Sequence, residues 1–284
     1  MQHRHDMPEV FEADVRPCVY AQALYHEKPP FLDESPMPVT TAVLLFLAGF
    51  LSSAVNAVAG GGTFLTFGAM TLAGLPPIVA NATSSIVQFP GYITSALAYR
   101  RELMADRRMA VMLGLLSAVG GLIGAGILLM LSNPSFRSLV PWLLLGATAI
   151  FAAGPLLRPK SREAGAPLGV LGLLGQFATS VYGGFFGAGM GIMMLAVLGL
   201  TAGGGYHRIN ALKNLLAVVI AAIAVVVFTF GGVVSWLEAA VMIPGGALGG
   251  YSGVWLARRI PQTIIRAFVV AVGLLLAFYY FVTG

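Results

Sequence analysis

Apolar stretches of about twenty residues recur from Val39 almost to the end of this chain, with short polar joints between them. A helix of that length crosses a hydrocarbon layer about 30 Å thick. Runs such as Leu215–Phe230 are apolar on every side, whereas the strands of a membrane β-barrel alternate apolar and polar residues. The chain is therefore predicted to be an all-α polytopic membrane protein with about eight transmembrane helices.

The composition agrees with a membrane protein, because 58% of the residues are hydrophobic and only 10% are charged, against about 25% charged residues in soluble domains. Residues 1–38 hold seven of the 11 acids and three of the 16 Lys and Arg residues, so the apolar remainder carries a net charge of +9. Most of these basic residues lie in the joints, as the positive-inside rule expects. We predict a multi-pass membrane protein, surrounded by the lipid bilayer and without a nucleic-acid partner.

The first 38 residues are polar and lack the apolar core of a signal peptide, so they are predicted to form a disordered extension. They contain His3 and His5, which are interpreted as incidental, and Cys18, the single cysteine, which excludes an intramolecular disulfide. The motifs of zinc proteases, serine hydrolases and nucleotide-binding enzymes are missing from the chain. We predict neither enzymatic activity nor a cofactor or bound metal.

Two glycine-rich breaks interrupt the apolar stretches, at residues 59–63 and 187–191. Each break is followed about twenty residues later by an Asn-Ala pair, which begins at Asn81 in the first case and at Asn210 in the second. Paired interruptions in corresponding halves of a membrane protein are typical of transporters, where they form half-helices around a central site. The alternative is that these glycines only permit tight helix packing.

A further glycine cluster follows each Asn-Ala pair, at residues 120–124 and 245–249, and here helix packing is the favoured interpretation. Three landmarks thus recur in the same order. They predict a two-fold internal repeat, with residues 39–165 as the first membrane repeat and 166–284 as the second.

The segments after the breaks, Thr63–Leu75 and Gly191–Thr201, are too short to cross a membrane alone. Each either continues the preceding helix beyond a kink or folds back as a re-entrant half-helix. Folding back places all the strongly basic joints on one side of the membrane, as the positive-inside rule requires. It also gives each half an odd number of segments, which predicts an inverted-topology repeat.

The residues around the breaks suit a small anion. A helix that begins after a glycine break presents free N–H groups and a partial positive charge, and amide, hydroxyl and ammonium groups can replace the water around an oxyanion. The candidate substrate-binding residues are Gly60, Gly61, Gly62, Thr63, Asn81, Thr83, Gly187, Gly189, Gly191, Asn210, Lys213 and Asn214.

Lys213 is the one cation that lies well inside an apolar segment, and it has two interpretations. It is either the counter-charge of an anionic substrate, or a lysine whose flexible stem extends to the membrane interface. The buried amides Gln88 and Gln176 either line a path or bond a neighbouring helix, and neither is a primary candidate. Glu238 is interpreted as interfacial rather than as a proton carrier.

The segments Asn56–Thr63, Pro76–Ser84 and Asn210–Asn214 resemble the TauE/SafE family of sulfite and organosulfonate exporters, and the resemblance extends from about Val39 to Val282. It implies an inner-membrane carrier of small anions such as sulfite, thiosulfate or organosulfonates, without a bound cofactor. The family often has a third consecutive glycine where this chain has Met190, which is expected to narrow that half of the site.

We therefore predict a secondary transporter, and specifically an exporter, of small anions that works by alternating access and is able to form homo-oligomers. The alternatives are a carrier of other organic anions, a passive channel, or a membrane scaffold or assembly protein whose glycines serve only helix packing.

Overall fold

A computed structural model describes residues 37–58, 60–104, 107–153, 169–202, 205–256 and 262–283. These residues belong to one compact unit that begins at Met37. All the regular elements within them are helices, which number eleven. The predicted N-terminal extension, with His3, His5 and Cys18, lies outside the described residues.

Five helices are long and apolar enough to cross a membrane, namely α2, α6, α7, α10 and α12, and α3, α8 and α9 are shorter apolar helices. The protein is thus an all-helical, polytopic membrane protein, as predicted. The helices are α2 (Val39–Val58), α3 (Thr63–Leu72), α4 (Pro77–Ala98), α5 (Arg100–Met104), α6 (Arg107–Leu129), α7 (Asn133–Ala153), α8 (Val170–Phe185), α9 (Met190–Thr201), α10 (Tyr206–Phe230), α11 (Trp236–Leu256) and α12 (Gln262–Thr283).

Three features differ from the apolar segments that the sequence predicts, which here are Ser138–Leu157 and Pro167–Tyr182. The short charged helix α5 was not predicted. Helix α7 begins earlier than expected, because the Ser132 hydroxyl accepts a hydrogen bond from the Ser135 N–H at 3.3 Å and caps the helix. Helix α8 continues through Gly183 and Gly184 instead of ending before them, since these glycines allow close approach to α9 and α6.

Helices α4 and α10 pack against each other, and most of the other pairings occur twice, with α4 against α7 and the contacts of α5 as exceptions. Helix α4 packs on α11 as α10 packs on α6, and α2 packs on α11 as α8 packs on α6. The short helices α3 and α9 contact α12 and α7, which in turn contact each other. The main contacts made by α2, α3, α4, α6 and α7 therefore have counterparts made by α8, α9, α10, α11 and α12.

The second pair of glycine clusters serves helix packing, as predicted. A Cβ atom on Gly120 or Gly124 of α6 would overlap atoms of α8. A Cβ atom on Gly245 or Gly249 of α11 would likewise overlap the main chain of α2. Small residues four apart thus bring the backbones together at equivalent places in the two halves.

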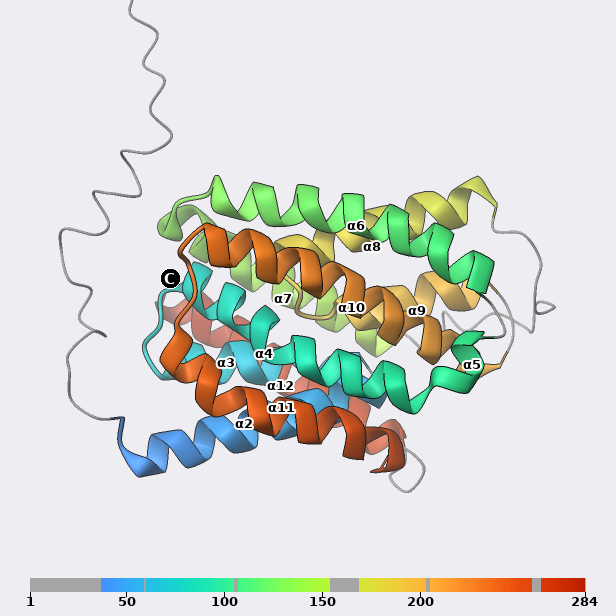
Figure 1. Ribbon diagram of the computed structural model, residues 1–284. Helices are drawn as coiled ribbons and strands as arrows, with labels where there is room; N and C mark the ends of the chain where they lie inside the picture. Colours follow the sequence, from blue (N-terminus) through green and yellow to red (C-terminus); the bar gives the residue numbers. More distant parts are fainter. Residues whose placement is uncertain are drawn as a thin grey trace, which may run out of the picture. The chain divides into compact units, whose positions relative to one another are not determined.

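The helix ends gather at two ends of the compact unit (Figure 1). At one end, the Ile78 N–H at the start of α4 donates to Asn133 of α7 at 3.1 Å. At the other end, the rings of Tyr99 after α4 and His207 of α10 lie 6.2 Å apart. The starts of α6 and α10, with their arginines, and the short helix α5 lie at this second end (Figure 1).

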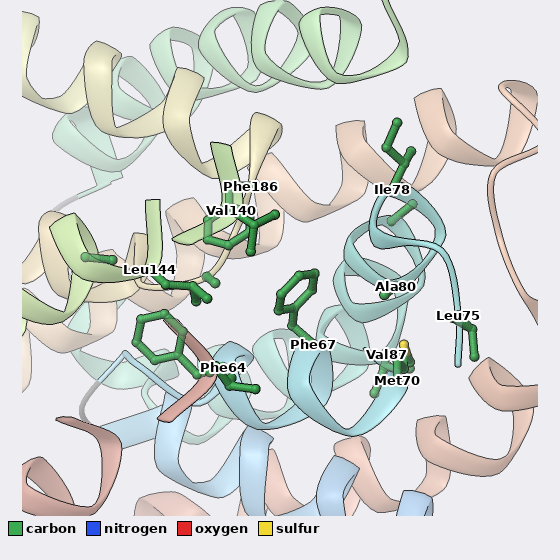
Figure 2. Close-up of a cluster of buried hydrophobic side chains, with 14 of the residues drawn as sticks. Phe64, Phe67, Met70, Leu75, Ile78, Ala80, Val87, Val140, Leu144 and Phe186 are labelled. Atoms are coloured by element: carbon green, nitrogen blue, oxygen red, sulfur yellow. The ribbon is translucent and has the colours of Figure 1, made fainter. Parts of the chain in front are cut away.

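The largest apolar cluster lies between α3, α4, α7 and the second glycine break. Figure 2 shows Phe64 and Phe67 of α3 pointing toward Leu144 of α7 and toward Phe186. The rings of Phe67 and Phe186 meet edge to face at 5.5 Å. This packing fixes the short helix α3 and the second break relative to each other.

Candidate functional site

At the first break the chain reverses. Helix α2 ends at Val58, and Gly60 has a φ of 85°, a conformation that glycine adopts without strain. Gly62 then lies against Ser52, more than one turn back along α2, and the Ser52 hydroxyl donates to the Gly62 carbonyl at 2.5 Å. Helix α3 therefore runs back beside α2 and does not extend it.

The second break reverses in a similar way. Helix α8 ends at Phe185, and both Gly187 and Gly189 have positive φ, 70° and 81°. The Tyr182 hydroxyl of α8 donates to the Ala188 carbonyl at 2.8 Å, which ties the break to the helix before it. Helix α9 then begins at Met190 and packs on α8.

The two breaks contact each other through their backbones. A Cβ atom on Gly60 would lie 2.5 Å from the carbonyl carbon of Gly191, and one on Gly191 would lie 2.7 Å from the Cα atom of Gly60. Only glycine allows two main chains to approach so closely. Residues 128 or more positions apart in the sequence thus form a single junction between the halves.

The asparagines that follow the breaks cap helices of the opposite half. Asn81 of α4 donates to the Phe185 carbonyl at the end of α8, at 2.9 Å. Asn210 of α10 donates to the Ala57 carbonyl near the end of α2, also at 2.9 Å. Each asparagine therefore satisfies a carbonyl that the interruption of a helix leaves without an intrahelical donor.

Lys213 lies in the interior, with 0% of its surface exposed, so the interpretation as an interfacial lysine is wrong. Its ammonium donates to the Asn56 carbonyl at 2.7 Å and to the Ala57 carbonyl at 3.4 Å, at the C-terminus of α2. The neighbouring Asn214 is equally buried, and neither its amide nitrogen nor its amide oxygen has a hydrogen-bond partner among the described residues. The cation thus lies one residue from a side chain with free hydrogen-bonding capacity.

A cavity of about 10 Å³, roughly the room that one water molecule needs, lies between the breaks and the central helices. The first residues of both short helices, Thr63 of α3 and Met190 of α9, line it. Helix α4 contributes polar side chains to the wall, and α10 contributes apolar ones. The remaining lining residues are Ser85, Gln88, Tyr92, Gly183, Gly187, Ile220, Ala221 and Ala224.

A buried polar network surrounds the polar side of this cavity. The Asn56 amide nitrogen donates to the Tyr92 hydroxyl at 2.7 Å, to Thr63 Oγ1 at 3.3 Å and to Gln88 Oε1 at 3.4 Å. Gln88 also accepts from Ser53 at 3.0 Å and donates to Ser52. The amide oxygen of Asn56 has no partner among the described residues. Because Lys213 binds the Asn56 carbonyl, the network connects the buried cation to the cavity wall.

The candidate residues from the sequence separate into groups. Thr63 and Gly187 line the cavity. Asn81, Asn210 and Lys213 bind helix C-termini, and Thr83 accepts a hydrogen bond from the Ser235 N–H before α11 at 3.0 Å. Asn214 lies beside Lys213 on α10. The other candidates form the two reversals themselves, namely Gly60, Gly61, Gly62, Gly189 and Gly191.

Three cavity-lining residues with polar side chains were not among the sequence candidates: Ser85, Gln88 and Tyr92. A signal was present, because these residues and Asn81 follow one another at intervals of three or four along α4 and so share one helix face. Gln176, by contrast, lies in a separate cluster with Ser117 at 3.1 Å, away from the cavity lining. Glu238 is half-buried at the start of α11, where the Ser235 hydroxyl donates to it.

Comparison with known proteins agrees with the resemblance noted from the motifs. The profile of the family described as "Sulfite exporter TauE/SafE" matches residues 45–280. A "Probable membrane transporter protein" of Haemophilus influenzae is 26% identical over 80% of this chain and 89% of its own length. "Probable membrane transporter protein ORF9" of Sinorhizobium sp is 27% identical over 82% of this chain and 89% of its own length. "Probable membrane transporter protein YfcA" of Escherichia coli is 27% identical over 83% of this chain and 87% of its own length. Because the family profile covers most of the sequence, this chain belongs to the sulfite exporter TauE/SafE family.

Proposed function

We propose that this protein is a secondary carrier that exports small anions, with sulfite or another sulfur oxyanion as substrate, across the inner membrane by alternating access. The observation that carries the proposal is the cavity between the two breaks, which the first residues of both α3 and α9 line. Helix N-termini attract negative charge. The names of the family and of the relatives support transport, and the family name supports the sulfur oxyanion.

Alternating access needs two halves that can move against each other, and the paired contacts support an inverted repeat. Helices α2 and α8 run in opposite directions between the two ends of the unit (Figure 1). Both short helices fold back beside the preceding helix, which supports their assignment as re-entrant half-helices. The backbone contact between Gly60 and Gly191 lies where the two halves meet, so a relative movement of the halves would change the cavity directly.

The anion is supported by Lys213, because a buried cation without an acidic partner is costly and usually functional. Among the described residues, no carboxylate lines the cavity, so none is placed to carry a proton with the substrate. We therefore propose uniport or anion exchange as the transport mode. Because the cavity has room for only about one water molecule here, we propose that movement of the halves enlarges it. The substrate then lies against Gln88, Tyr92, Ser85 and Thr63, and Lys213 contributes positive charge from behind Asn56.

Counterflow of radiolabelled sulfite into proteoliposomes tests the proposal, because a carrier exchanges label against a gradient and a pore does not. The chain offers a matched pair of variants: Gln88→Leu removes a buried amide at the cavity, and Gln176→Leu removes one elsewhere. Each amide bonds two serines, and Gln88 also accepts from Asn56, so both variants should lose about 1–3 kcal/mol of stability, with the larger loss in Gln88→Leu.

We expect counterflow by the wild type and by the Gln176→Leu variant, and at least about tenfold slower counterflow by the Gln88→Leu variant, which corresponds to about 1.4 kcal/mol. Equal rates in the two variants would contradict the proposed site. Sulfite movement without counterflow would indicate a channel, and no sulfite movement by folded wild-type protein would favour a scaffold or a carrier of another solute.

A further inference from the structure

We propose that the site selects anions with a single negative charge, sulfite in its hydrogensulfite form among them, and discriminates against dianions of the same size. This inference rests on the proposed function, because it specifies the charge of the anion that the same cavity takes. It follows from the number and position of the buried charges, from the helix ends at the breaks, and from the chemistry of the cavity wall.

Lys213 is the only fully buried Lys, Arg, Asp or Glu side chain among the described residues. Its ammonium has three donors and binds the carbonyls of Asn56 and Ala57. The side chain of Asn56 also belongs to the polar network around the cavity. A substrate in the cavity therefore has at most one buried cationic side chain near it among the described residues, and that side chain lies behind the cavity wall. No second cation among the described residues is buried near enough to compensate a second negative charge.

The helix ends at the breaks add little net charge to that of Lys213. Each break joins the C-terminus of one helix, with a partial negative charge, to the N-terminus of the next, with a partial positive charge. These opposite partial charges of about half a unit lie within a few residues of each other and partly offset each other, so the N-termini at the cavity favour an anion without supplying a second full charge. The exposed carbonyls are moreover already bonded, by Asn81 at the end of α8 and by Asn210 and Lys213 at the end of α2.

The cavity wall offers hydrogen bonds on one side only. Hydroxyl and amide groups of α3 and α4, including Thr63 and Gln88, can bond the oxygens of an anion without adding charge. The α10 side is apolar, with Ile220, Ala221 and Ala224. An uncompensated second charge would be desolvated against this wall at a high cost. A methyl group in place of a fourth oxygen would instead fit it.

Methanesulfonate and sulfate form a suitable pair for the test, because both are tetrahedral around sulfur and differ in one methyl group and one charge. Lactate and malonate give a second pair if the substrate is a carboxylate. Thermal unfolding of the purified full-length protein is recorded against the concentration of each anion, at a constant ionic strength set with sodium gluconate. Specific binding gives a saturating rise of the melting temperature, whereas the general stabilising effect of sulfate on proteins does not saturate.

We expect a saturating shift for the monoanion of at least one pair. Its apparent affinity should be about tenfold or more above that of the dianion, a difference in binding free energy of about 1.4 kcal/mol. The Lys213→Met variant should lose this saturating shift. The monoanion and dianion of each pair are compared on the wild type, so the test does not depend on the folding of the variant. An equal or higher affinity for the dianion would overturn the charge selectivity and leave the anion carrier intact. No saturating shift with any of the four anions, or with sulfite measured in the same way, would overturn both.

Discussion

The central helices α4 and α10 follow equivalent breaks and yet present different chemistry to the cavity. On α4, polar residues continue along one face four, seven and eleven positions after Asn81: these are Ser85, Gln88 and Tyr92. At the same distances from Asn210, α10 has Asn214 and then Ala217 and Ala221. The polar face thus reaches the cavity on α4 and stops short of it on α10.

A second difference lies three residues after each asparagine, where α10 has Lys213 and α4 has Ser84. Lys213 binds the end of α2, whereas the Ser84 hydroxyl contacts the Met70 sulfur at 3.7 Å. The comparison teaches that the repeated glycines and asparagines specify a shared backbone plan. The hydrogen-bonding groups come from one half and the charge from the other, so the two halves are not interchangeable.

The largest loss of stability is expected for a substitution at the backbone contact between the two glycine breaks. Gly60→Ala introduces strain at positive φ, about 1 kcal/mol, and overlap with the backbone of Gly191, about 1–3 kcal/mol more. The control Gly74→Ala has the same strain at a φ of 89° but nothing within 4 Å. Thermal unfolding in detergent should show a much larger loss for Gly60→Ala, and equal losses would mean that the junction is not tightly packed.

The two asparagine caps should differ in strength. Asn81→Ala leaves the Phe185 carbonyl without its donor, which should cost about 2 kcal/mol. Asn210→Ala should cost less, about 1 kcal/mol, because Lys213 also donates to the Ala57 carbonyl. Chemical unfolding of the two variants checks the order. The reverse order would show that Lys213 does not support the end of α2.

The smallest effect on stability is expected at the second break, where the effect on transport should nevertheless be large. A Cβ atom on Gly187 would make only ordinary contacts, 3.5 Å from the Gly183 carbonyl and 3.6 Å from the Ser85 hydroxyl. Gly187→Ala should therefore cost about 1 kcal/mol, as the Gly74→Ala control does. Its methyl group would occupy the cavity wall, so sulfite counterflow should fall strongly for Gly187→Ala and remain normal for Gly74→Ala. Normal counterflow in both variants would mean that the cavity is not part of the transport site.

Much of the fold could be predicted from the sequence, because uninterrupted apolar stretches leave few alternatives to helices in a bilayer. The ends of α2, α4 and α10 lie within two residues of the apolar segments that the sequence predicts, Val39–Ala59, Pro77–Tyr99 and Arg208–Phe230. Helix α5 could not be found in this way, since its five charged and apolar residues give no periodic signal. The reversal at each glycine break was favoured by loop charge alone, and the sequence did not indicate that Gly60 and Gly191 touch.

The site was harder to predict, because a buried donor can bind either a substrate or a backbone carbonyl. Asn81, Asn210 and Lys213 were assigned to the substrate, but interrupting α2 and α8 also creates carbonyls that need donors. Gln88 was set aside because a single amide in an apolar helix carries little information. Its position on one face with Ser85 and Tyr92 was the more informative pattern.

Cysteine accessibility tests the central claim most directly, namely that the anion binds in the cavity between the breaks. In a background with Cys18→Ser, the Ser85→Cys variant places a thiol on the cavity wall, and Ser117→Cys places one in the buried cluster around Gln176. The rate of modification by a small anionic methanethiosulfonate reagent is measured in membranes, with and without sulfite or methanesulfonate. The account predicts that Ser85→Cys is modified much faster than Ser117→Cys and that one of these anions slows its modification. Equal rates in the two variants, or a rate at Ser85→Cys that neither anion changes, would contradict it.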